Sequence, residues 1–589
     1  MKMMNSKNKL VLTLFLLVTI LSSCSEEWLE PKPLSFYAPE NVYIDEAGFE
    51  ALMVTMRKDI KSEFYSERGP ISNEHAMSDL GVPGAQSNNV VKDFVQVLTP
   101  AGDGGSHNFP GKLFNLAYNS IRNANVMVSR IDNVNWETEE IRNRLMASAY
   151  FYRAYWYYRL VNSYGDVPFI GEEITGPKLD FFTHSRWTIL DKIQEDLEWG
   201  VNWLPESAEP GALTKGAGAH LLAKIALANL DFDGAIAAAS QVIDGPYELM
   251  TTRFGIHASD PSRNIFWDLH RLDNVNDPAN TETILSVIDR FEDPVGAKTD
   301  GSRLPRVYNP AWWHSRNRDS SGGPGTVADG LQYDTLFRGN GNCRPTPYYL
   351  YEIWDYENDM RRSDNNWVEW YEIIYNNPGS PDFGLPINRD NFAVAIDTFQ
   401  HSYSFPHYKT FVPEQDPAAN PSGGNGDQYV FRLAETYLLR AEARFWKGDL
   451  AGAAIDLNTI RQRAGALPVT AGEIDIDVIF DERARELFTE EPRHGEMIRA
   501  SYIMAKQGIN GYTLDNFSEK NWFYDRVMRT NVFFQINLKW GQQSYNIAPH
   551  NALWPIPETV ISENTLGKIN QNEGYTGASQ NVPPLESIQ

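Results

Sequence analysis

The chain has 589 residues, and 77 acidic against 52 basic side chains give it a formal net charge of −25. This balance excludes nucleic acid as a partner, because phosphate binding needs concentrated lysine and arginine, and it also excludes electrostatic docking on anionic lipid. A hydrophobic content of 42% is sufficient for a large core. The length therefore fits one large domain or two to three smaller ones.

Residues 1–23 have the pattern of a secretory signal. Three lysines precede an apolar run at 10–21, which is too short to span a bilayer. Small residues then lead directly into Cys24, as in a bacterial lipobox, where the cysteine is acylated (as by palmitate) and begins the mature protein. The alternative is an ordinary cleaved signal with an incidental cysteine. If Cys24 carries lipid, Cys343 has no disulfide partner and is expected to be a packed, non-catalytic thiol.

The proline-containing segment 24–45 is predicted to be a tether, and no later run is apolar enough to span a membrane. Helices are predicted at 111–131 and 137–163 from their apolar periodicity. Seven of the nine residues at 150–158 are aromatic. A helix that is apolar on nearly all sides is normally buried, so we expect these rings in the core.

Two helix hairpins are predicted at 214–244 and 429–464, each with alanine-rich faces and a tight turn. They are typical of tetratricopeptide-like units, although the period is too irregular to count repeats. Residues 475–500 are predicted to form one charged helix. The segment 551–575 includes a proline-containing extended stretch, because proline does not fit helix interiors or sheet centres.

Helical periodicity fades between 250 and 425, where Gly, Pro, Asn and Asp recur every few residues. Residues 303–375 contain 14 aromatic side chains, which favours an ordered, functional stretch over a disordered one. Flat rings with polar neighbours suit the capture of sugars, whose C–H faces stack on them. The candidate ligand-binding residues are Trp312 and Trp313, followed by Tyr308 and Trp354. The alternative is that these rings form loop core or a protein contact.

Two further patterns were considered as sites of chemistry. Glu482 and Glu486 lie one helical turn apart, as a glycosidase acid/base pair could, but the arginines around them favour salt-linked packing or a solvated face. The segment 273–277 offers possible oxygen ligands for a structural Ca²⁺, from Asp273, Asn274, Asn276 and Asp277. The glycine and terminal glutamate of an EF-hand are missing there. No metalloprotease, P-loop or nucleophile-elbow motif is present, so neither catalysis nor a cofactor is expected.

Four motifs, in order along the chain, resemble those of the SusD/RagB family of Bacteroidota outer-membrane lipoproteins. They are the aromatic helix that ends in Tyr164-Gly165-Asp166-Val167-Pro168, the segment from Phe431 to Ala443, the segment from Asp481 to Leu487, and Leu553-Trp554-Pro555-Ile556-Pro557. Each motif alone is weakly specific. Together, behind a lipobox, they extend the resemblance over nearly the whole chain.

The resemblance implies an all-α, mainly helical fold in which tetratricopeptide-like hairpins support a long loop-rich ligand-binding region. The helical scaffold would comprise about 46–249 and 426–589, and the ligand face about 250–425, within a single domain 46–589. The resemblance also implies a lipoprotein of the cell outer membrane, anchored through Cys24 and facing the exterior. Such a protein binds an oligosaccharide without catalysis and delivers it to a SusC-like TonB-dependent transporter. A surface-anchored glycoside hydrolase and a peptide-binding member of the same fold are the alternatives.

Overall fold

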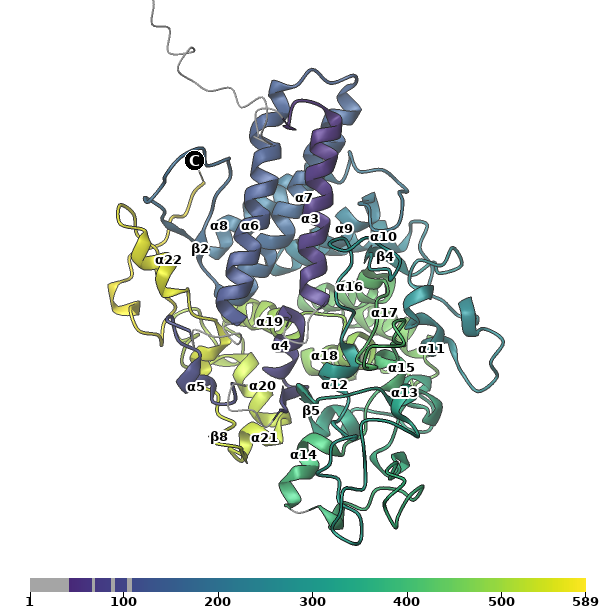
Figure 1. The fold of residues 1–589 in the computed structure, drawn as a ribbon. Coiled ribbons are helices and arrows are strands. Elements are labelled where there is room, and N and C mark those ends of the chain that lie inside the picture. Colours follow the sequence, from purple (N-terminus) through teal and green to yellow (C-terminus); the bar gives the residue numbers. More distant parts are fainter. Residues whose placement is uncertain (1–41, 66–68, 86–90, 103–108, 393, 589) are drawn as a thin grey trace, which may run out of the picture.

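The computed structural model describes residues 42–65, 69–85, 91–102, 109–392 and 394–588 (Figure 1). Cys24 lies outside these ranges, so the signal segment, the lipidated cysteine and most of the tether stay predictions. Within the described ranges, no helix combines the length and the apolar composition needed to cross a bilayer.

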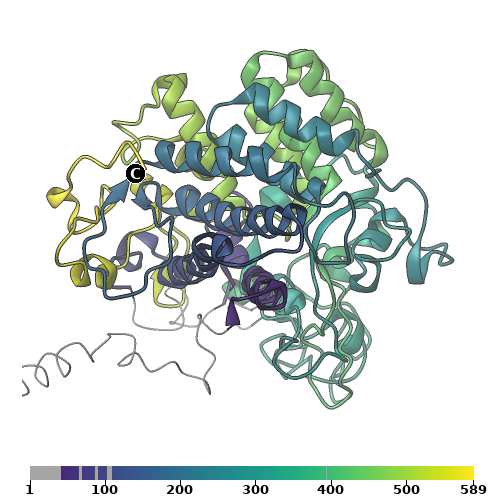
Figure 2. The same ribbon diagram turned by 90° about the horizontal axis from the view of Figure 1, so that it is seen from above.

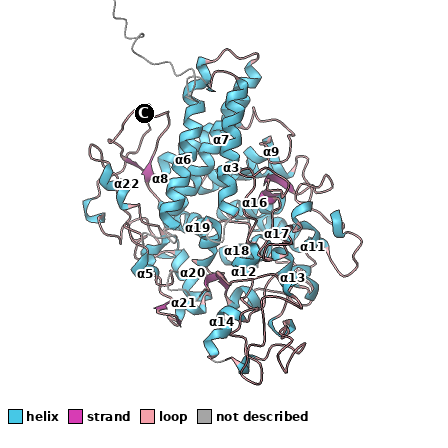
Figure 3. Ribbon diagram, in the orientation of Figure 1, coloured by secondary structure: helices cyan, strands magenta, loops and turns pink. Residues whose placement is uncertain are grey.

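The described part of the chain is mainly helical, as predicted, and its strands are short (Figure 3). The α-helices are α3 (Glu46–Phe64), α4 (Pro70–Ala76), α5 (Phe94–Val97), α6 (Phe109–Arg130), α7 (Glu139–Tyr164), α8 (Arg186–Gly200), α9 (Lys215–Ala228), α10 (Phe232–Ile243), α11 (Ile265–Leu269), α12 (Leu304–Tyr308), α13 (Tyr333–Leu336), α14 (Thr398–His401), α15 (His407–Thr410), α16 (Leu433–Lys447), α17 (Leu450–Arg463), α18 (Ile476–Leu487), α19 (Arg493–Gln507), α20 (Trp522–Thr530), α21 (Val532–Gln535) and α22 (Glu558–Glu563). The strands form four antiparallel pairs: β1 (Gly81–Pro83) with β5 (Cys343–Pro345), β2 (Val167–Pro168) with β3 (Thr183–His184), β4 (Thr283–Val287) with β6 (Gln428–Arg432), and β7 (Lys539–Trp540) with β8 (Gln543–Ser544).

Consecutive helices of the scaffold pack side by side in the order α6, α7, α8, α9, α10, α16 and α17 (Figures 1 and 2). The two predicted hairpins are present as α9–α10 and α16–α17, and α10 packs directly on α16, which joins them. Asp231 and Asp449 cap the second helix of each hairpin, accepting hydrogen bonds from the backbone N–H groups of Gly234 and Gly452 at 2.9 Å. Both turns therefore stop and restart the helix within a few residues.

The aromatic helix α7 lies at the centre of the largest apolar cluster, as its composition predicted. Trp156 and Tyr157 are fully buried, and Tyr150 is half-buried. The tyrosine hydroxyls that are buried still find polar partners: Tyr158 donates to Glu496 Oε1 at 3.0 Å, and Tyr155 donates to Glu63. Burial of large rings whose hydroxyls keep hydrogen-bond partners stabilises the scaffold, although the buried indole N–H of Trp156 has no partner.

Two predictions of element boundaries were wrong. The hairpin predicted to begin at 429 begins instead at Leu433, because Gln428–Arg432 forms β6 and pairs with β4. The charged helix predicted over 475–500 is two helices, α18 and α19, separated at 488–492. Thr489 has a positive φ of 75° and Pro492 precedes α19, and neither conformation fits a continuous helix.

Residues 250–425 contain only short helices, turns and strands, as predicted, and they lie to one side of the long helices (teal to green in Figures 1 and 2). We call this part the irregular lobe. Apolar side chains within it form their own buried clusters, one of which gathers Trp312, Tyr333, Tyr375 and Phe405. The β1–β5 and β4–β6 pairs connect the lobe to segments before and after it. The scaffold therefore holds the lobe at two points, near its beginning and near its middle.

Candidate functional site

Three of the four aromatic residues proposed from the sequence are buried. Trp312 is 0% exposed, Tyr308 is 1% exposed and Trp354 is 7% exposed. Their polar atoms are also engaged, since the indole N–H groups of Trp312 and Trp354 donate to the carbonyls of Phe337 and Tyr349 at 2.9 and 2.5 Å. A ring enclosed on both faces cannot stack on a ligand, so these three residues act as loop core in this conformation.

Trp313 is only half-buried and stays a candidate for ligand contact. Its indole N–H donates to the carbonyl of Gly339 at 2.7 Å, and the guanidinium of Arg338 lies 4.5 Å from its ring centre. These contacts fix the ring and cover one of its faces. Ligand access would therefore be confined to the opposite face.

The irregular lobe exposes a different group of rings, which we call the aromatic surface: Tyr351, Tyr356, Trp370 and Tyr371. The three tyrosines are 39%, 50% and 54% exposed, and Trp370 is half-buried. Trp370 and Tyr371 meet edge to face with their centres 5.6 Å apart. Exposure of several large rings in one neighbourhood commonly marks a binding site.

Polar side chains connect the members of the aromatic surface. Ser404 lies at the centre: its hydroxyl accepts from the Tyr351 hydroxyl at 3.3 Å and from the Trp370 backbone N–H at 3.2 Å, and it donates to Glu369 at 2.5 Å. Glu369 also accepts from Arg362 at 2.5 Å. Ser404 and Arg362 are buried, so this network fixes the positions of the rings, and the rings themselves present the exposed surface. Flat rings with a few polar groups are typical of ligand sites.

Sequence reasoning counted Tyr351 and Trp370 among the aromatic residues of this stretch but did not select them. Local polarity separates Trp370 from Trp312, although not from Trp354, which is buried next to Asp355. Charged residues flank Trp370-Tyr371 on both sides, at Glu369 and Glu372, whereas Pro310 and Ala311 precede the buried Trp312. Rings within a charged segment are more often left at the surface, because burying the segment would leave its charges without water or ion-pair partners.

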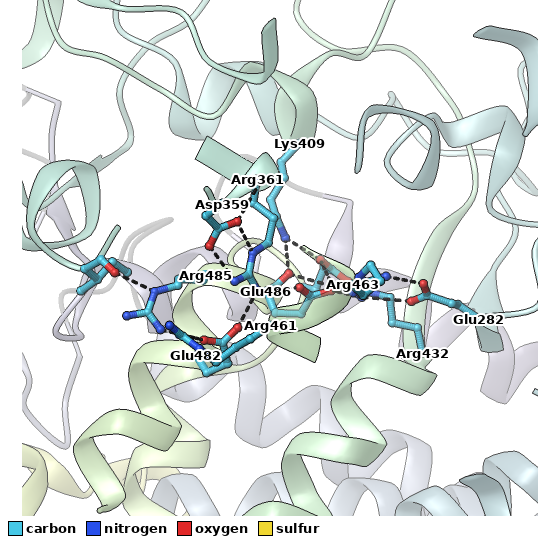
Figure 4. A network of polar contacts seen from close by, with 12 residues as sticks. Glu282, Asp359, Arg361, Lys409, Arg432, Arg461, Arg463, Glu482, Arg485 and Glu486 are labelled. Atoms are coloured by element: carbon cyan, nitrogen blue, oxygen red, sulfur yellow. Dashed lines mark hydrogen bonds and ion pairs between the residues drawn. The ribbon is translucent and has the colours of Figure 1, made fainter. Parts of the chain in front are cut away.

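Glu482 and Glu486 belong to a buried ion-pair network and not to a catalytic pair (Figure 4). Arg361, Arg461 and Arg485 contact Glu482 at 2.7–2.8 Å. Arg432 and Arg361 contact Glu486 at 2.6 and 2.8 Å.

The charges of these arginines decide the protonation of both carboxyl groups. Although burial alone would raise the pKa of Glu482, the neighbouring guanidinium groups lower it to about 2. Arginines also hold the pKa of Glu486 well below its ordinary value against the opposing effect of burial. A general acid needs a raised pKa and access to substrate, and neither carboxyl group has them. Salt-linked packing, one of the two structural interpretations, is thereby confirmed.

The oxygen atoms proposed as Ca²⁺ ligands already have protein partners. The side-chain oxygen of Asn274 accepts from the Ile256 backbone N–H at 3.2 Å, and that of Asn276 accepts from the Ser286 hydroxyl at 2.9 Å. Asp277 accepts from the backbone N–H of Ala279 at 2.8 Å. In the described ranges, no cluster of His, Cys, Asp and Glu side chains could hold a metal ion. Cys343 is buried, and burial raises the pKa of its thiol.

A cavity of about 510 Å³ lies outside the irregular lobe, between α8, the end of α19 and the C-terminal segment. Trp187 lines it, but the ammonium group of Lys506 lies 4.9 Å from the Trp187 ring centre, and Tyr502 packs against the ring at 6.1 Å. This ring is thus more enclosed than the tyrosines of the aromatic surface. The aromatic surface is therefore the stronger candidate for ligand capture.

Comparison with known proteins agrees with the architecture. The family model described as "SusD family" matches residues 299–575, and the one described as "Starch-binding associating with outer membrane" matches residues 50–227. A SusD-like protein of Formosa agariphila is 24% identical over 598 aligned positions, covering 95% of this chain and 98% of its relative. The starch-binding protein SusD of Bacteroides thetaiotaomicron is 29% identical over 182 residues, covering 31% of this chain and 27% of SusD.

Solved structures show the same fold at lower identity. A laminarin-binding SusD-like protein superposes with a TM-score of 0.61 at 20% identity, covering 90% of this chain and 100% of that one. Surface glycan-binding protein A of Bacteroides thetaiotaomicron, solved with laminarihexaose, superposes with a TM-score of 0.60 at 16% identity, covering 90% and 99% of the two chains. These likenesses extend over nearly the whole described part of the chain.

Proposed function

The chain belongs to the SusD/RagB family, and from this premise we propose that it captures an oligosaccharide on the aromatic surface without cleaving it. The observation that carries the proposal is the exposure of Tyr351, Tyr356 and Tyr371 beside Trp370 on an irregular lobe held by a rigid helical scaffold. Relatives described as binding starch, laminarin and laminarihexaose support a glycan as the ligand. The buried state of Glu482 and Glu486 removes the carboxylate pair on which the hydrolase alternative depended.

The proposal includes delivery of the captured glycan to a SusC-like TonB-dependent transporter in the outer membrane. The chain would be held there through acylated Cys24, facing the exterior. Its strongly negative charge gives no attraction to anionic lipid, so attachment must come from acyl chains or from a protein partner, and two or more chains are needed for stable lipid anchoring. A Cys24→Ala protein is expected to keep its fold and glycan affinity but to leave the membrane fraction. Unchanged retention would contradict the anchor.

The capture site is tested by calorimetry of the mature chain against a panel of oligosaccharides. We expect Tyr371→Ala and Trp370→Ala to weaken binding about tenfold, the effect of removing a central aromatic contact. The matched control is Trp199→Ala on α8, which removes a ring of 36% exposure from the scaffold. If Trp199→Ala weakens binding as much as the two surface variants do, the aromatic surface is not the site.

The same experiment separates the alternatives. Release of shorter products at catalytic rates would favour the surface-anchored glycoside hydrolase. Binding of peptides with no binding of any saccharide would favour the peptide-binding member of the fold. Binding of intact saccharide that is lost in the Tyr371→Ala variant supports capture.

A further inference from the structure

We infer that the aromatic surface takes an anionic saccharide, with Arg344 and Arg389 binding its carboxylate or sulfate group. This inference rests on the proposed glycan capture and adds to it the charge of the ligand. It starts from two guanidinium groups that have no carboxylate partner among the described residues: Arg389, which stacks on Trp370, and Arg344, which stacks on the buried ring of Tyr403.

Arg389 lies against the aromatic surface itself. Its guanidinium is 3.7 Å from the ring centre of Trp370. Its Nε and Nη2 donate to the hydroxyl and carbonyl oxygens of Ser402 at 3.1 and 2.6 Å, and its Nη1 makes no hydrogen bond to a described residue and is not buried. Asp390 follows Arg389 in the chain without forming an ion pair with it. The Nη1 group of the positively charged Arg389 guanidinium is therefore open to a ligand.

Arg344, on β5, is held among aromatic rings. Its guanidinium lies 4.1 Å from the Tyr403 ring centre and 5.6 Å from that of Phe399. Its Nε and Nη1 are buried without a hydrogen-bond partner, so Nη2 is the nitrogen that solvent reaches. Burial, with a smaller contribution from the charge of Arg389, lowers the pKa of Arg344 to about 10 against the opposing effects of the Tyr403 and Tyr351 hydroxyls. Both arginines therefore stay charged at neutral pH near the same exposed tyrosine.

Several fully buried arginines in the described part of the chain have polar partners. Arg159, Arg493 and Arg499 of the scaffold each contact carboxylates at 2.5–2.9 Å. Stacking on a ring does not replace such partners elsewhere: Arg271 lies 4.1 Å from the Trp267 ring centre, yet it also donates to three backbone carbonyls. Arg344 lacks both kinds of partner. A guanidinium left without an acceptor is costly to bury, and an incoming anion would offset that cost.

Two of the acids near the aromatic surface already have arginine partners. Glu369 is paired with Arg362 at 2.5 Å, and Asp397 is paired with Arg316 at 3.0 Å. Neither of them neutralises Arg389. In a chain whose net charge is −25, a guanidinium with an open N–H group beside exposed rings favours a ligand of negative charge.

The test compares three oligosaccharides of equal length: a neutral one, one that carries uronate carboxylates, and one that carries sulfate esters. We expect calorimetry to show binding of at least one charged form about tenfold or more tighter than the neutral form, the gain of one charge-assisted hydrogen bond. The charged oligosaccharide that binds more tightly shows whether the site prefers a carboxylate or a sulfate group. Raising the salt concentration should weaken the charged form and leave the neutral form nearly unchanged.

Two variants of Arg389 and one control variant test whether Arg389 causes the preference. Arg389→Gln should weaken the charged form about tenfold and the neutral form less than about twofold. Arg389→Lys keeps the charge but loses the planar fork, so its loss should be smaller. The control is Arg529→Gln on α20, which removes the same charge from a side chain that is 53% exposed and pairs with Asp477. It should leave both affinities unchanged.

The outcomes separate this inference from the proposed function. Equal binding of neutral and charged forms, insensitive to salt and to Arg389→Gln, would overturn the anionic ligand and leave glycan capture intact. No binding of any of the three forms, with none across the wider panel, would remove capture itself. If Arg389→Gln fails to fold, Arg389→Lys and the salt dependence of the unmodified protein still decide the question.

Discussion

Glu482 and Glu486 are spaced as a catalytic carboxylate pair could be, but the arginines around Glu482 give it a structural role. The sequence showed arginines near it along α18, at Arg483 and Arg485. It could not show that Arg361 and Arg461, from distant segments, reach the same carboxylate. Such long-range pairing sets the protonation state, so the chemistry of this residue was decided by the tertiary structure.

The lowered pKa of Glu482 predicts a loss of stability in acid. The folded protein keeps this carboxylate charged down to about pH 2, whereas the unfolded chain protonates it near its ordinary value of 4.5. Its stabilising contribution is therefore complete above about pH 4.5 and is lost as the pH falls toward 2. The shift corresponds to roughly 3 kcal/mol in the free energy of unfolding, as an order of magnitude.

The variant Glu482→Gln tests this directly by urea unfolding between pH 7 and pH 2. At neutral pH we expect it to lower the free energy of unfolding by about 3–5 kcal/mol, because buried arginines lose their partner. Its further loss in acid should be smaller than that of the unmodified protein. The control Glu206→Gln removes a carboxylate that is 76% exposed and should have little effect. Parallel pH curves for Glu482→Gln and the unmodified protein would contradict the prediction.

At the scale of elements, the sequence predicted correctly those helices and turns that depend on interactions between residues close in the chain. The α9–α10 and α16–α17 hairpins were predicted because alanine faces, capping aspartates and turn glycines are all readable in sequence. Strand β6 was missed because its five buried residues match the apolar face of a helix equally well, and only pairing with β4 favours the strand. The break between α18 and α19 could have been predicted from Pro492.

A substitution in the turn of the second hairpin tests how backbone conformation alone affects stability. Gly448 ends α16 with a φ of 86°, and a Cβ added there would meet no atom within 4 Å. The substitution Gly448→Ala therefore adds no clash, only the cost of a left-handed conformation, about 1 kcal/mol in the free energy of unfolding. Gly472→Ala is the matched control, because that site is equally open and its φ is not positive. Equal effects of the two substitutions in urea unfolding would refute the argument.

At the scale of the whole molecule, the helical scaffold and the position of the irregular lobe were predicted, but the face that the lobe exposes was not. Composition showed that aromatic residues concentrate at 303–375. It could not tell which rings fill the interior of the lobe, as Trp312 does, and which remain outside, as Tyr371 does. That division depends on how loops of irregular geometry pack against one another, and periodicity carries no signal for it.

The buried ion-pair network also bears on whether the lobe and the scaffold behave as separate domains. It joins Glu282, just before β4, Arg361 and Lys409 of the lobe, Arg432 on β6 and Glu486 on α18 (Figure 4). Its members come from segments more than 200 residues apart in the chain. Unfolding the lobe alone would leave the charges of the scaffold buried and unpaired, which is costly.

We therefore predict that lobe and scaffold unfold as one unit, in keeping with a single domain. Far-UV circular dichroism follows the helices, and hydrogen exchange of peptides from 300–400 follows the lobe. The two midpoints in urea should coincide, and Glu486→Gln should lower both together, because the network couples them. Exchange of the lobe peptides at urea concentrations where the helices remain folded would show two independent units. In that case the network would serve each side separately, and the aromatic surface would not depend on the scaffold for its shape.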